Sequence, residues 1–104
     1  MPLSITRAVR DAVYGKKKIK KGDYVVIARK ELISSASNIV KALREAFEKI
    51  KVGEKEILTV FLGENHQKKE LEEIERFIRE NYPGLDLEVL EGGQPHYPYL
   101  MLLQ

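Results

Sequence analysis

The sequence contains neither cysteine nor tryptophan, and it has only two histidines. The missing thiols exclude a disulfide framework, thiolate metal sites and cysteine nucleophiles. No apolar run approaches the ~18–20 residues that a membrane-spanning helix needs, and no signal peptide opens the chain, so we expect a cytoplasmic location. The 104 residues suffice for one domain, which we expect to cover residues 1–104.

Motifs of nucleotide-binding and hydrolytic enzymes are absent as well. Neither G-x-x-x-x-G-K-[ST] nor G-x-G-x-x-G occurs, and no serine lies in a nucleophile elbow. His66 and His96 are too few for a closed zinc site. The glutamates of residues 70–75 indicate a solvated helix face rather than an acid/base pair. We therefore expect no catalytic residue, no metal site and no cofactor in this chain.

Charge is unevenly distributed along the chain. Residues 1–30 hold nine Lys or Arg and two Asp, a net charge of +7, whereas residues 31–104 have a net charge of −5. The positive charge centres on a lysine run at residues 16–21 (Lys16, Lys17, Lys18, Lys20 and Lys21). Such a run binds phosphates or an acidic protein surface, or it is a solvated turn between two strands. Because no aromatic residues are interleaved with the lysines, nucleic acid is the least favoured partner.

The hydrophobic pattern of the first half predicts strands followed by a helix. Residues 4–13 fit either a strand or a helix, and their β-branched side chains favour a strand. Tyr24–Ala28 predicts a strand buried on both faces. Ser34–Ser37 is typical of a helix N-cap, and the apolar residues of 39–50 recur at three- and four-residue intervals. We expect an amphipathic helix of about four turns there.

The second half predicts a strand–helix–strand unit. Residues 56–62 form a nearly continuous apolar run, which favours a central strand. Asn65 is a candidate cap for the helix that follows, and the alternation at 85–89 predicts a strand parallel to the first. Residues 97–103 predict a last strand, at an edge or a bulge because Pro98 cannot donate a hydrogen bond. We thus expect an α/β fold, a mixed sheet of about five strands with two helices mainly on one face.

The loop at residues 92–99 is the leading candidate for a binding site. Two glycines and two prolines make it stiff, and it carries Gln94, His96, Tyr97 and Tyr99. Rigid amphipathic side chains suit partner surfaces, because they lose little entropy on docking. Alternatively, the tyrosines cover the sheet and Gln94 ties down the turn.

Two further segments are candidates for binding. Gly63–His66 lies between a predicted parallel strand and a helix, where open α/β sheets bind ligands, although simple helix capping is the alternative. Arg10 either pairs with Asp11 or uses its bidentate fork to hold a loop or a partner carboxylate.

Four segments appear in an order that resembles a known family. They are Thr6–Asp11 (TRAVRD), Ile19–Tyr24 (IKKGDY), Leu58–Glu64 (LTVFLGE) and Gly92–Tyr99 (GGQPHYPY). Together they resemble the C-terminal region of the dihydroxyacetone-kinase-like proteins that are associated with bacterial fatty acid kinase as its kinase component. The resemblance covers nearly the whole chain, and GGQP-x-YPY is its most specific element.

This resemblance implies a docking role. The complete protein of the family has an ATP-binding kinase domain, a middle domain and this C-terminal domain, and the enzyme phosphorylates a fatty acid presented by a DegV-type fatty-acid-binding partner. ATP and Mg²⁺ are expected in the kinase domain. We expect Gln94, His96, Tyr97 and Tyr99 to contact the partner, with Arg7, Arg10 and the lysine run for steering. A small-molecule-binding or enzymatic domain using residues 63–66 and 92–99 is the alternative.

Overall fold

Eight strands, two α-helices and one 3-10 turn follow one another in a computed structural model that describes residues 1–104. Their bounds are β1 Pro2–Arg7, β2 Ala12–Tyr14, β3 Lys17–Ile19, β4 Tyr24–Ala28, β5 Glu31–Ala36, α1 Ile39–Lys49, the 3-10 turn Val52–Glu54, β6 Ile57–Leu62, α2 Lys68–Asn81, β7 Asp86–Glu91 and β8 Tyr99–Leu103. With 11 residues, α1 makes about three turns rather than four.

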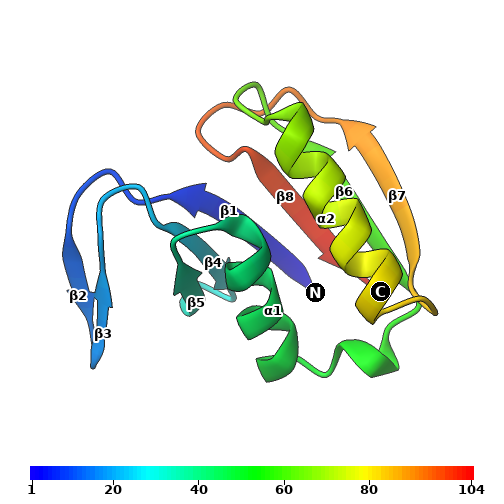
Figure 1. Ribbon diagram of the computed structural model, residues 1–104, viewed down its shortest axis with the longest axis horizontal. Helices are drawn as coiled ribbons and strands as arrows, with labels where there is room; N and C mark the ends of the chain where they lie inside the picture. The colour runs from blue at the N-terminus through cyan, green and yellow to red at the C-terminus, as the bar shows by residue number, and fades with distance from the viewer.

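Six strands form one mixed sheet in the order β5-β4-β1-β8-β6-β7, and β2 and β3 form a separate hairpin. Within the six-stranded sheet only β6 and β7 are parallel neighbours, and α2 connects them. Both helices lie on the same side of the sheet, in front of it in Figure 1. The expected α/β fold class is confirmed, with six strands in the main sheet instead of about five.

The core lies between the helices and one face of the sheet. Because side chains alternate along a strand, every second residue faces the helices. In β1 these are Leu3 and Ile5, and in β8 they are Tyr99, Met101 and Leu103, all at most 2% exposed. They join a cluster of 22 buried residues that includes the apolar stripes of α1 and α2. The position of these two strands makes them the centre of the molecule.

The strand predicted at residues 4–13 is wrong in its extent. β1 ends at Arg7, and β2 begins at Ala12 in a different sheet. Between them the Ala8 N–H donates to the Asp23 carbonyl, and the Gly22 N–H donates to the Ala8 carbonyl, both at 2.8 Å. These bonds close the base of the β2–β3 hairpin, so the chain leaves the main sheet there.

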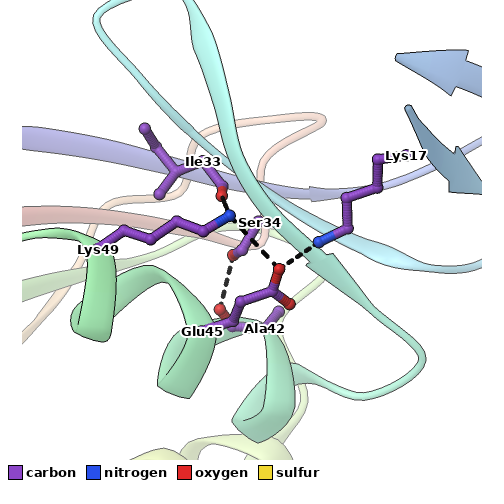
Figure 2. Close-up of polar contacts among 6 residues, drawn as sticks. All are labelled: Lys17, Ile33, Ser34, Ala42, Glu45 and Lys49. Atoms are coloured by element: carbon purple, nitrogen blue, oxygen red, sulfur yellow. Dashed lines mark hydrogen bonds and ion pairs between the residues drawn. The ribbon is translucent and has the colours of Figure 1, made fainter. Parts of the chain in front are cut away.

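The serine cluster belongs to a strand that the sequence analysis missed. Ser34 and Ser35 lie in β5, and the helix cap is Asn38, whose Oδ1 accepts from the Lys41 N–H at 2.9 Å. The Ser34 hydroxyl donates to the Ala42 carbonyl at 2.7 Å, as Figure 2 shows, and this bond lets the serine lie fully buried under α1. The predicted N-cap at Ser34–Ser37 is therefore wrong.

The last strand also differs from its prediction. β8 begins at Tyr99 rather than at residue 97, and it lies between β1 and β6 instead of at an edge. The missing N–H of Pro98 leaves no gap in the sheet hydrogen bonds, because Pro98 stands directly before the paired segment. Its carbonyl accepts from the Gly63 N–H at 2.8 Å. The proline thus ends a loop and marks no sheet edge.

Candidate partner-binding surface

The structure joins the two loops that the sequence analysis treated separately. Since β6 and β7 are parallel, the segments that follow them meet at one end of the sheet. The Gly92 and Gly93 N–H groups both donate to the Leu62 carbonyl at 2.9 Å, and the Glu64 N–H donates to the Gln94 carbonyl at 3.0 Å. Residues 63–67 and 92–98 therefore form one hydrogen-bonded unit, here called the loop pair.

Gly63 permits the close approach of these loops. A Cβ at this position would lie 2.1 Å from the Tyr97 carbonyl oxygen and 2.9 Å from that of Gln94. Both distances are shorter than any real carbon–oxygen contact of this kind, so only glycine fits without moving the loop. The GGQP-x-YPY segment thus depends on a glycine about 30 residues earlier in the chain.

Gln94 holds the loop pair together with its side chain. Its Nε2 donates to the Phe61 carbonyl at 2.8 Å and to the Tyr97 carbonyl at 3.2 Å. The side chain is half-buried. Both side-chain N–H donors are used inside the molecule, which matches the interpretation that Gln94 ties down the turn.

His96 and Tyr97 face outward from this braced loop. His96 is exposed and adopts a left-handed backbone with φ of 70°, and the Tyr97 side chain is 39% exposed. The Thr6 hydroxyl at the end of β1 donates to the His96 carbonyl at 3.1 Å. Two of the four loop residues expected at a partner surface are therefore accessible, on a backbone anchored from β1 and β6.

Tyr99 is fully buried, so the expectation that it displays its ring to a partner is corrected. Its hydroxyl accepts from the Gln67 N–H at 3.3 Å and donates to Glu70 Oε1 at 3.0 Å. Burial, together with the negative charge of Glu70, raises the pKa of Tyr99 well above its ordinary value. The alternation of Tyr99 with Met101 and Leu103 was the sequence signal for this inward orientation.

The start of α2 is organised by Tyr99 and not by Asn65. The N-cap residue is Gln67, and its own side chain makes no capping bond. Asn65 lies in a turn before it, where His66 Nδ1 is 2.7 Å from the Gly63 carbonyl oxygen. The predicted Asn65 cap is wrong, because a hydroxyl from β8 takes the place of a local side chain.

The two candidate arginines lie at and beyond the end of β1. Arg7 Nε donates to the Gly22 carbonyl at 3.3 Å, and its guanidinium lies 5.2 Å from the centre of the Tyr24 ring. Arg10 is exposed and forms no ion pair. Asp11 instead accepts from the Lys21 N–H at 2.8 Å, so the expected Arg10–Asp11 pair does not form.

The lysine run is a strand of a projecting hairpin, which corrects its interpretation as a turn between two strands. The turn is at Gly15-Lys16, with a φ of 62° at the glycine, and Lys17–Ile19 forms β3. Figure 1 shows β2 and β3 standing away from the main sheet. The hairpin is connected to the end of β1, near the loop pair to which Thr6 bonds.

Backbone hydrogen bonds join the two loops directly and leave no pocket between them. None of the hollows in the molecular surface is lined by residues 63–66 or 92–99. Neither helix is long and apolar enough to span a membrane. What this end of the molecule offers is a surface with His96, Tyr97 and cationic side chains.

Comparison with known proteins assigns the family. A family model for the C-terminal domain of FakA-like fatty acid kinase proteins matches residues 1–104. An uncharacterized protein of Staphylococcus aureus (strain MRSA252) is 32% identical over 101 residues, which cover 97% of this chain and 18% of that protein. Protein YloV of Bacillus subtilis is 32% identical over 97 residues, 93% of this chain and 18% of YloV. The chain spans less than a fifth of these relatives, and it belongs to the FakA-like C-terminal domain family of fatty acid kinase.

Proposed function

We propose that this chain is a non-catalytic docking domain of a fatty acid kinase subunit. Its partner is a DegV-type fatty-acid-binding protein, and the loop pair is the contact surface. The observation that carries this proposal is the exposure of His96 and Tyr97 on a loop that Gly63, Gln94 and Thr6 hold in place. A preformed surface loses little conformational entropy when it binds.

The proposed contribution to the reaction is positional. Phosphoryl transfer depends mainly on placing the reactants and stabilising charge, so a docking domain can raise the rate without a reacting group. ATP and Mg²⁺ are expected to bind the kinase domain of a longer cytoplasmic protein. In this chain no group of three or more carboxylate or imidazole side chains is placed to hold a metal ion, and we assign no reaction step to its residues.

A calorimetric titration of this chain with a DegV-type fatty-acid-binding protein tests the proposal. We expect Tyr97→Ala to weaken binding about tenfold or more, as for an interface tyrosine at a hot spot. Arg10→Gln is expected to weaken binding modestly and to reduce the dependence of the affinity on salt. Leu90→Ala is the matched control, because Leu90 is 49% exposed on β7 and lies outside the loop pair. Equal affinities for the wild type and Tyr97→Ala would reject this surface.

A further inference from the structure

Three apolar side chains next to the lysine run are unusually exposed. Val9 is 82% exposed, Val13 69% and Tyr14 57%, which exceeds every other large hydrophobic residue of the chain. All three lie within six consecutive residues, at the base and in the first strand of the β2–β3 hairpin. Three such residues in one short projecting hairpin indicate a segment that interacts with a partner.

The same hairpin concentrates positive charge. Residues 9–21 contain six Lys or Arg and one Asp. Lys16, Lys18, Lys20 and Lys21 are exposed and form no ion pair. Val13 pairs with Lys18 across the strands, so these two side chains share one face of the hairpin. Tyr14 pairs with Lys17 and projects from the opposite face, next to the turn.

The hairpin contacts the rest of the domain through β3 and at its base. In Figure 2 Lys17 reaches from β3 to Glu45 on α1, and Lys49 lies 3.5 Å from the same carboxylate oxygen while donating to the Ile33 carbonyl at 2.8 Å. At the base, Asp11 accepts from the Lys21 N–H. Lys17 is the one hairpin lysine with an ion partner, and this pair ties the hairpin to the domain while the other lysines stay free.

We infer that this hairpin binds the surface of an anionic phospholipid bilayer. The tip of the hairpin enters the boundary between headgroups and acyl chains with Val13 on one face and Tyr14 on the other, and the free lysines lie against the phosphates. Tyrosine favours this boundary because its ring is apolar and its hydroxyl is polar. Lysine stems follow apolar surface while the ammonium groups remain at headgroup level.

The composition of the hairpin favours lipid over an acidic protein surface. Lysine is depleted from protein–protein interfaces, where arginine is enriched, and only Arg10 represents arginine in this segment. Clustered lysines suit the diffuse charge of anionic lipids, where each contributes independently. This inference does not rest on the proposed docking function, whose contact surface is the loop pair and which uses only Arg10 of this segment, for steering.

Sedimentation of the chain with lipid vesicles tests the inference. One set of vesicles is phosphatidylcholine alone, and the other contains about one-third phosphatidylglycerol. We expect binding to the anionic vesicles only, falling steeply as salt is added. Each lysine removed is expected to weaken binding about fivefold. Failure of the chain to bind anionic vesicles at low salt would overturn the inference.

Paired variants test whether vesicle binding depends on the hairpin itself or on any exposed charge or apolar side chain of the chain. Lys16→Gln/Lys18→Gln and Val13→Ser/Tyr14→Ser are each expected to lower vesicle binding more than tenfold. The controls are Lys68→Gln/Lys69→Gln, which removes two exposed charges at the start of α2, and Leu90→Ser on β7. Unchanged binding by both controls supports the inference, and equal losses in the controls overturn it.

The same variants distinguish the alternative partners. If Val13→Ser/Tyr14→Ser retains full vesicle binding, the attraction is purely electrostatic and the inference is wrong. If that variant loses affinity for the DegV-type partner while wild-type chain ignores vesicles, the hairpin belongs to the protein-docking surface. That result would overturn the lipid inference and leave the proposed function intact. Conversely, if Tyr97→Ala does not weaken partner binding, only the proposed function is rejected.

Discussion

The loop at residues 92–98 and the hairpin at residues 8–21 both leave the sheet at the same end, but they use their side chains in opposite ways. In the loop, Gln94 donates to two carbonyls, and Tyr99, directly beyond it, is fully buried. In the hairpin, Val13 and Tyr14 are more than half exposed. The loop exposes His96 and Tyr97 but uses Gln94 and Tyr99 for the interior, whereas the hairpin exposes its apolar side chains.

This difference shows that residue type alone is a poor guide to recognition. Glutamine, histidine and tyrosine in a proline-containing loop are typical of a contact surface, yet two of the four candidate residues, Gln94 and Tyr99, serve the interior. The lysine run is typical of a solvated turn, yet it lies beside the most exposed apolar groups of the chain. Which groups are free is decided by the contacts that the rest of the fold makes with them.

The largest expected effect is the loss of the Tyr99 ring. Tyr99→Ala is expected to lower the free energy of unfolding by about 3–5 kcal/mol, because the ring is fully buried in the core cluster. Tyr14→Ala, in the hairpin, is expected to change it by less than about 0.5 kcal/mol. Urea denaturation measures both, and similar losses in the two variants would break the comparison.

Gly63→Ala tests the close approach within the loop pair. We expect a loss of about 2–3 kcal/mol, because the new Cβ collides with the carbonyls of Gln94 and Tyr97. Gly84→Ala is the matched control, since a Cβ there meets nothing within 4 Å, and its effect is expected within about 0.5 kcal/mol. Thermal unfolding of both variants checks this, and equal melting temperatures would show that the loop is adaptable.

Tyr99→Phe isolates the hydroxyl that organises the start of α2. The loss of the bonds to Gln67 and Glu70 is expected to cost about 1–2 kcal/mol near neutral pH. The folded pKa of Tyr99 lies above its ordinary value of 10.0, so the unfolded chain releases this proton first and wild-type stability falls as pH rises beyond 10.0. Denaturation on both sides of that pH should show a shallower decline for Tyr99→Phe, and identical slopes would contradict this role.

Glu45→Gln is expected to have a smaller effect on the attachment of the hairpin. Partial burial pushes the pKa of Glu45 upward, but Lys17 and Lys49 outweigh it and hold the pKa below its ordinary value of 4.5. The stabilisation is therefore present above 4.5 and is lost as pH falls through the lower folded pKa. Because the side chain is 36% exposed, we expect about 0.5 kcal/mol at neutral pH. A difference from wild type that persists in strong acid would contradict this ion pair.

The smallest effect on stability is expected from the hairpin surface itself. Val13→Ser/Tyr14→Ser should change the free energy of unfolding by no more than about 0.5 kcal/mol, because both side chains lie in solvent. Circular dichroism and urea denaturation check this. A loss above about 1 kcal/mol would show that these side chains serve the fold and not a binding partner.

The strand–helix–strand unit could be predicted from the sequence because its signals are local and agree with one another. The apolar run of β6, the stripe of α2 and the alternation of β7 each extend over several residues. Their parallel pairing is confirmed. The core positions Ile74, Phe77 and Ile78 are buried as their spacing predicts.

The other elements depend on contacts that local patterns do not contain. β5 was missed because a serine is rarely buried, and Ser34 is buried here with its hydroxyl donating to the Ala42 carbonyl on α1. The turn before β5 gave no signal either, since it is made by Arg29 and Lys30, with φ of 52° and 65°. Such turns usually carry Asn or Gly. The boundary between β1 and β2 likewise depends on distant backbone hydrogen bonds. Ala8 donates to Asp23 and accepts from Gly22, and both partners follow the hairpin in the chain.

Taken alone, the sequence determined the α/β class, the family and the segments that carry chemical interest, because periodicity, glycine and proline placement and ordered motifs are properties of the chain itself. Only the tertiary structure decided that Tyr99 faces the core, that Gly63 meets the 92–98 loop, and that the lysine run projects beside exposed valines. Burial and hydrogen bonding are relations between distant segments, and they exist only once the sheet brings those segments together.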